Sequence, residues 1–215
     1  MEKLIYVLVL FYLISCGNPV DSDKNIVKDK IKSKDVFARP TAINSLWTYR
    51  IDAVYTENGL NKLPVNYPVN IQENVLSKND VKGENWFIST INGNDVNVQV
   101  GEDFIYYEVD EFEKLILPIS TYTDLYIKVN SEEDWTYNGI DYTYLGNSNI
   151  DINGTIYNVK SVKFENKAVN QTGATYTKTV YYNSDLGIVK IEYLYNFTTR
   201  LTIFNLKLDL LSFKQ

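Results

Sequence analysis

The segment 176–195 reads YTKTVYYNSDLGIVKIEYLY and contains two runs of alternating residues joined by a turn. In the first run Tyr176, Lys178 and Val180 fall on one side and threonines on the other. Successive side chains of a strand point to opposite faces, so this alternation predicts strands with one face on a core and one in water. The Asp-Leu-Gly sequence ending at Gly187 suits a turn or bulge between them.

The same period of two recurs from about Pro40 onward, including residues 47–55, 96–100 and 204–210. Turn signals separate the runs: the chain has four Asn-Gly pairs, Asn58-Gly59, Asn92-Gly93, Asn138-Gly139 and Asn153-Gly154. Asn-Gly favours tight hairpins because type I′ turns need positive φ at both central residues. With 18 tyrosines and no long helical pattern, residues 40–215 are predicted to be all-β: an antiparallel curved sheet or half-barrel, with a closed barrel or sandwich as alternatives.

Composition and charge exclude several functions. The chain of 215 residues has a formal net charge of −6, whereas nucleic-acid binding requires a basic face. It contains no histidine, which excludes histidine-based triads and zinc sites. With one cysteine, it cannot form an intramolecular disulfide. No cofactor-binding motif was found, so no cofactor is expected.

The N-terminus predicts export and lipid anchoring. The apolar run Leu4–Ile14 is shorter than the roughly 20 residues of a membrane-spanning helix and suits a signal-peptide core. Leu13, Ser15, Cys16 and Gly17 resemble the lipobox of bacterial lipoproteins. The prediction is a signal peptide at 1–15 and a polar, flexible tether at 16–39 that carries acyl chains such as palmitate on Cys16. The alternative is an ordinary signal peptide or short anchor with an incidental cysteine.

The segment 181–190 also resembles an aromatic–x–x–x–x–Gly–aliphatic–Val–Lys signature of uncharacterised bacterial lipoproteins with a half-barrel fold. Residues 45–49, Leu117-Pro118, 135–137 and 150–164 fall in the order of that family. The family is similar to lipoprotein carriers and receptors that hold acyl chains against a curved antiparallel sheet. The resemblance therefore implies a half-barrel with an apolar ligand on its concave face. The sequence departs from the carriers because it has no obvious helical plug.

Acidic residues cluster at Glu108, Asp110, Glu111 and Glu113, and again at Glu132, Glu133 and Asp134. Paired carboxylates can serve a glycosidase or bind a divalent cation. The alternation around Glu108, however, suits a solvated strand face, and surface charge is the favoured interpretation. The segment 149–154 matches the first half of a calcium loop, but Lys160 stands where the bidentate glutamate is needed, so a hairpin is predicted instead.

Trp47, Trp86 and Trp135 can be stacking platforms for a ligand or core residues. Core packing is favoured for the first two, while Trp135, together with Tyr137, is the candidate ligand-binding pair because it follows an acidic loop. No nucleophile or metal-ligand constellation accompanies them, so no catalytic residue and no metal site are predicted.

The sequence thus predicts a non-enzymatic envelope lipoprotein, membrane-anchored through Cys16, that binds a lipid or other apolar ligand on a concave sheet. Gly17, which is not acidic, favours the outer membrane. One alternative is a structural lipoprotein that binds an envelope protein through a sheet edge. Another is a carbohydrate-binding or carbohydrate-active surface protein, which needs two carboxylates about 5–10 Å apart.

Overall fold

The structure is a computed structural model that describes residues 39–57, 60–62, 70–83, 85–116, 124–166, 174–197 and 202–215. Within these ranges it contains thirteen strands and a short helix, α2 (Glu111–Ile116). The strands are β1 (Leu46–Glu57), β2 (Leu60–Lys62), β3 (Asn70–Lys78), β4 (Trp86–Ile91), β5 (Asn94–Val100), β6 (Phe104–Tyr107), β7 (Leu125–Lys128), β8 (Trp135–Tyr137), β9 (Ile140–Ile152), β10 (Thr155–Asn166), β11 (Ala174–Asn183), β12 (Gly187–Phe197) and β13 (Thr202–Lys214).

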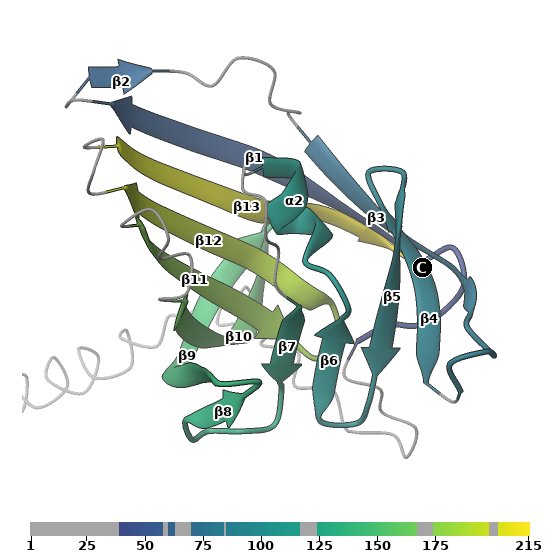
Figure 1. Cartoon of the computed structure of the whole chain (residues 1–215). Helices are drawn as coiled ribbons and strands as arrows, with labels where there is room; N and C mark the ends of the chain where they lie inside the picture. Colours follow the sequence, from purple (N-terminus) through teal and green to yellow (C-terminus); the bar gives the residue numbers. More distant parts are fainter. Residues whose placement is uncertain are drawn as a thin grey trace, which may run out of the picture.

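The strands form one antiparallel sheet in the order β7-β6-β5-β4-β3-β1-β13-β12-β11-β10-β9-β8, with β2 paired to β1. Strand β1 joins two meanders, because it pairs with β3 on one side and β13 on the other. Figure 1 shows the sheet curving around an interior in which α2 lies between the two halves. The predicted antiparallel half-barrel is confirmed, as one sheet that nearly closes on itself rather than two stacked sheets.

The two edge strands, β7 and β8, meet through side chains. The rings of Tyr126 on β7 and Tyr137 on β8 stack with centroids 4.1 Å apart. Beside them, the amide of Asn138 donates a hydrogen bond to Asp124 at 3.1 Å. Aromatic stacking therefore joins the edges of the half-barrel.

Three of the predicted Asn-Gly hairpins are confirmed. The turns at Asn92-Gly93, Asn138-Gly139 and Asn153-Gly154 each have positive φ at both residues, and each links two consecutive strands. Asn58-Gly59 lies outside the described residues. The 149–154 segment forms the hairpin expected of it instead of a calcium loop, and the described residues contain no group of three or more potential metal ligands.

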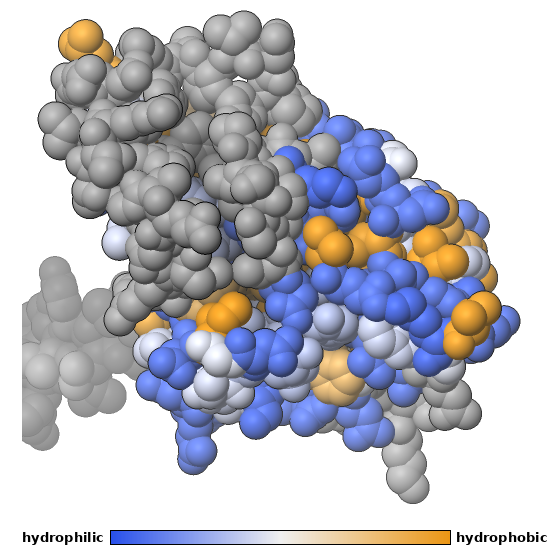
Figure 2. All heavy atoms as spheres, in the orientation of Figure 1, coloured by the Kyte–Doolittle hydropathy of each residue, from blue (hydrophilic) through white to orange (hydrophobic). Residues whose placement is uncertain are grey.

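The alternating residues line the interior as predicted. Trp47 and Tyr49 on β1 are buried, and their neighbour Arg50 is exposed. The core also includes the inward side chains of β5 (Val96, Val98, Val100), β11 (Tyr176, Val180, Tyr182), β12 (Ile191, Tyr193, Tyr195) and β13 (Leu206, Leu208, Leu210). On the face in Figure 2, hydrophobic residues are interspersed with hydrophilic ones where the atoms are coloured. The large apolar cluster of the described residues lies in the interior.

The 181–190 segment has a structural role in the turn between β11 and β12. The indole of Trp47 donates to the carbonyl of Leu186 at 2.6 Å, and the hydroxyl of Tyr49 donates to that of Ile188 at 3.0 Å. Gly187 has a φ of 80° and lies where a Cβ would be 3.2 Å from the Cβ of Arg39. The positive φ favours glycine, and a Cβ at this position would crowd Arg39, so Gly187 suits the turn between β11 and β12.

The helix α2 corrects the expectation that the half-barrel lacks a plug. Asp110 caps the helix, since its Oδ1 accepts a hydrogen bond from the backbone N–H of Glu113 at 3.1 Å. Acidic Glu111 in the first turn and basic Lys114 in the last suit the helix dipole. Its six residues are too few to show a helical period in the sequence. No helix in the described ranges is long and apolar enough to cross a membrane.

The predicted signal peptide, Cys16 and most of the tether lie outside the described residues. Arg39, the last residue assigned to the tether, is buried against the barrel. Its guanidinium bonds to Glu73 at 2.8 Å and lies 4.1 Å from the ring centre of Trp47. The folded domain therefore includes Arg39.

Candidate functional site

Four inward side chains of β11 and β12 face the helix α2: Tyr176, Lys178, Tyr193 and Tyr195. The sheet register pairs Tyr176 with Tyr195 and Lys178 with Tyr193, so the four residues form a compact block. We call this block the plug site. All four are buried, so the predicted core face of 176–182, Lys178 included, is confirmed.

An ion pair lies at one end of the plug site. The ammonium of Lys178 contacts the carboxylate of Asp110, and both side chains are 0% exposed. The hydroxyl of Tyr193 donates to Oδ2 of Asp110 at 3.2 Å. A buried charge needs such partners, because burying it without one is strongly unfavourable. Asp110 thus ties the start of α2 to β11 and β12.

A second carboxylate binds at the other end. The hydroxyl of Tyr195 donates to Oε1 of Glu113 at 2.7 Å, and that of Tyr176 donates to Oε2 at 2.9 Å. The two tyrosine rings stack with centroids 4.5 Å apart. Hydrogen bonds to a charged acceptor are stronger than neutral ones, so Glu113 fixes the first turn of α2.

Burial determines the protonation of these groups. It raises the pKa of Tyr176 and Tyr193 well above the ordinary value, and the nearby negative charge of Glu113 adds to the effect. Both hydroxyls therefore remain hydrogen-bond donors at neutral pH. Burial lowers the pKa of Lys178, whereas contact with the Asp110 carboxylate favours its charged form.

Between the two carboxylates, α2 carries an apolar side chain into the interior. Phe112 is 0% exposed, and its ring lies edge-on to Tyr49 of β1 at 5.4 Å and to Tyr107 of β6 at 6.1 Å, centroid to centroid. The helix thus presents two carboxylates to the plug site and a phenyl ring to the opposite strands.

The surface-charge interpretation of the first acidic cluster is wrong for three residues. Asp110, Glu111 and Glu113 are all at most 4% exposed. The reason is that strand β6 ends at Tyr107, so the alternation beyond it does not continue a strand face. Glu108 lies nearer the surface, where it contacts Lys82.

The second acidic cluster fits the surface interpretation. Glu132, Glu133 and Asp134 are exposed, and Glu132 pairs with Lys160 at 3.3 Å. The two acidic clusters thus lie in different environments, one in the interior and one on the surface. The core prediction is confirmed for Trp47, whose side chain is 1% exposed. It is wrong for Trp86, which is half-buried on the face of β4 opposite the buried Phe87 and lies outside the core.

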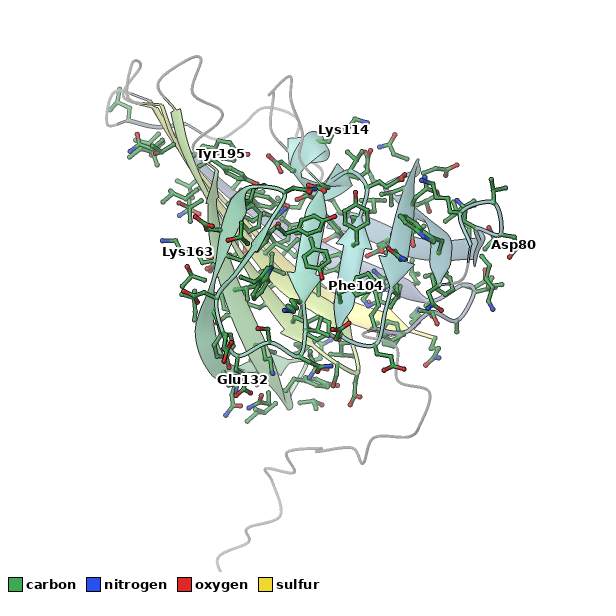
Figure 3. The ribbon with its side chains drawn as sticks, turned by 60° about the horizontal axis from the view of Figure 1, so that its bottom comes forward. Asp80, Phe104, Lys114, Glu132, Lys163 and Tyr195 are labelled. Carbon is green, nitrogen blue, oxygen red and sulfur yellow. The ribbon has the colours of Figure 1, made fainter. Side chains whose placement is uncertain are left out.

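The candidate residues Trp135 and Tyr137 are half-buried on one face of β8, and both pack against the core. Trp135 stacks on the buried Tyr142, with centroids 5.1 Å apart and planes 7° apart. Tyr137 also belongs to a series of half-buried rings in which each ring contacts the next: Trp86, Tyr106, Tyr137, Tyr126 and Phe104. We call this group the outer aromatic surface. Figure 3 shows Phe104 and adjacent rings on the strands β6 and β7.

The comparisons with known proteins identify structural likenesses only. No protein-family model matches the sequence, and no curated protein matches it. The fold is similar to that of an assumed exported protein with a YmcC-like fold from Bacteroides fragilis, at 10% identity and a TM-score of 0.48, covering 84% of this chain and 100% of that one. It is also similar to an assumed lipoprotein from Parabacteroides distasonis, at 11% identity and a TM-score of 0.47, covering 83% and 99%. Because both TM-scores are below 0.5, we infer function from this chain's own residues.

Proposed function

We propose that the protein is a non-enzymatic lipoprotein of the bacterial envelope that binds an apolar ligand inside the half-barrel, in the space α2 fills. The lipid on Cys16 anchors it, and the absence of an acidic residue at Gly17 favours the outer membrane. Two acyl chains on one cysteine are sufficient for stable anchoring. The observation that carries the proposal is the burial of Phe112 between the two halves of the barrel.

The connection that carries α2 is long for its task. Residues 108–124 link β6 to β7, two adjacent antiparallel strands. Two residues can make such a link, so most of this connection is not needed to join the strands. An isolated helix of six residues is unstable in water, so α2 depends on its contacts with the barrel. A ligand that replaces those contacts can therefore displace it.

Removing the phenyl ring tests this proposal. Phe112→Ala reduces the packing free energy that holds α2 in the barrel by about 3–5 kcal/mol. Displacing α2 from the interior therefore costs less in this variant. The full chain should then bind the neutral probe N-phenyl-1-naphthylamine with a dissociation constant lower by about tenfold or more. The fluorescence of the probe measures this binding. Phe87→Ala is the matched control, since it also removes a buried phenyl ring but belongs to β4. Equal binding by the two variants and the wild-type chain would contradict the proposal.

A second candidate function rests on the outer aromatic surface. Tyrosine and tryptophan are enriched in protein interfaces because they bury a large area and keep a polar atom for hydrogen bonding. This surface brings together five such rings, counting Phe104, from β4, β6, β7 and β8. If it binds an envelope protein, Trp86→Ala should abolish capture of that partner from solubilised envelopes. Phe112→Ala should leave the capture unchanged.

A further inference from the structure

We propose that the interior ligand is an anionic amphiphile whose charged head binds the plug site in place of the carboxylates of Asp110 and Glu113. This inference rests on the proposed function and specifies its ligand. The helix α2 is then an internal stand-in for the ligand, because it offers the barrel the same two chemical groups: a negative charge and an apolar body.

The four plug-site residues are the groups that would bind the head group of the ligand. Without α2, β11 and β12 present one ammonium and three hydroxyl donors to the interior, and in the structure every one of them contacts a carboxylate. A carboxylate or phosphate accepts both kinds of bond. An anion therefore matches all four groups, whereas a ligand head that can only donate would leave the ammonium of Lys178 without an acceptor.

The wall opposite the plug site is lined by aromatic rings. Phe112 contacts the rings of Tyr49 and Tyr107, both at most 1% exposed. These rings lie on β1 and β6, whereas the plug site lies on β11 and β12. A ligand that fills the space of α2 must therefore bring its charge to one wall and its hydrocarbon to the other, as an acyl chain with an anionic head does.

Charge pairing decides between classes of amphiphile. A neutral ligand that displaced Asp110 would leave Lys178 without a counter-charge in a water-poor interior, and a cationic ligand would repel it. An anionic ligand restores the ion pair. The predicted preference is thus anionic over neutral over cationic for ligands with the same chain.

Two kinds of envelope molecule combine an anionic head with an acyl chain: a free fatty acid and an anionic phospholipid. The test uses the full chain in phosphatidylcholine nanodiscs, so that the surrounding lipid carries no net negative charge. Four photoreactive probes with the same chain are each cross-linked to the protein: palmitic acid, hexadecanol, hexadecylamine and a phosphatidylglycerol. Mass spectrometry then quantifies labelling of peptides from β1, β6, β11 and β12.

The palmitic acid or the phosphatidylglycerol should label these peptides at least about fivefold more than the alcohol, a difference of about 1 kcal/mol by RT ln 5. Whichever anion labels more is the source. Equal labelling by acid, phosphatidylglycerol and alcohol would overturn the anionic inference and leave the proposed function standing. Labelling by none of the probes would overturn both.

Variants of the ion pair test the role of Lys178. Lys178→Met combined with Asp110→Asn removes both buried charges and so leaves no lone charge to prevent folding. This variant should still be labelled inside the barrel but should lose the preference for the anion. Lys207→Met is the matched control, because it removes a partly exposed lysine of β13 and should keep the preference. A preference that persists in the double variant would contradict the assignment.

Discussion

The ammonium of Lys178 on β11 contacts the carboxylate of Asp110 at the start of α2, and both side chains are completely buried. This pair joins the long connection between β6 and β7 in one meander to the inner wall of the other meander. The stability of the fold should depend on this pair, because neither charge can be solvated by water if its partner is removed.

Removing one partner of the Lys178–Asp110 ion pair should destabilise the fold more than removing both partners together. Lys178→Met or Asp110→Asn alone leaves a buried group unpaired and should lower the free energy of unfolding by about 3–5 kcal/mol. The double variant should be destabilised by less than the sum of the two. Denaturant unfolding of all four proteins gives this coupling as a double-mutant cycle. Strict additivity would mean that the two groups do not interact.

The tyrosine hydroxyls that hold Glu113 should also contribute measurably. Tyr195→Phe removes the donor at 2.7 Å from a buried carboxylate and should cost about 1–3 kcal/mol of unfolding free energy. Tyr181→Phe is the comparison, because its hydroxyl bonds to Glu192 on a partly exposed face and should cost less than about 1 kcal/mol. Urea unfolding measures both, and equal losses would show that burial of Glu113 is immaterial.

Alkaline pH should destabilise the fold through its tyrosines. Burial raises the pKa of Tyr106 and of Tyr181 to about 12, above the ordinary value of 10. A raised folded-state pKa means that the folded form favours the neutral phenol, so this stability is complete below pH 10. It is lost as the pH rises from 10 towards 12. Absorbance of tyrosinate should therefore rise near pH 10 in denaturant and near pH 12 for these residues in the folded chain. A Tyr106→Phe variant should remove part of the later rise.

The turn between β11 and β12 should not tolerate a side chain at Gly187. Gly187 and Gly154 have nearly the same φ, 80° and 81°, but only Gly187 has a neighbour where a Cβ would lie. Each substitution by alanine incurs the left-handed strain of about 1–2 kcal/mol. Gly187→Ala should lose a further ~1–3 kcal/mol against the side chain of Arg39. Thermal or urea unfolding of the two variants measures the difference, and equal losses would show that Arg39 moves aside freely.

The strands could be predicted from local pattern, but the plug site could not. Alternation placed Lys178 on the tyrosine face of β11, and the Asn-Gly pairs located three hairpins, because both signals lie within a few residues. The residues that contact this tyrosine face could not be predicted from the sequence, because they lie far away along the chain. Tyr176 and Glu113 are 63 residues apart in sequence, and a six-residue helix leaves no period. One signal was present: a lysine among core residues of a strand requires a buried counter-charge.

Hydrogen–deuterium exchange of the segment 108–116 in the full chain, with and without saturating palmitate, tests the central claim most directly. If α2 occupies a ligand site, ligand should displace it. The amides of 108–116 should then exchange at least about tenfold faster with ligand bound, while those of β11 and β12 stay protected. Protection of α2 that is unchanged by bound palmitate would contradict the account, because ligand and helix cannot share the same space.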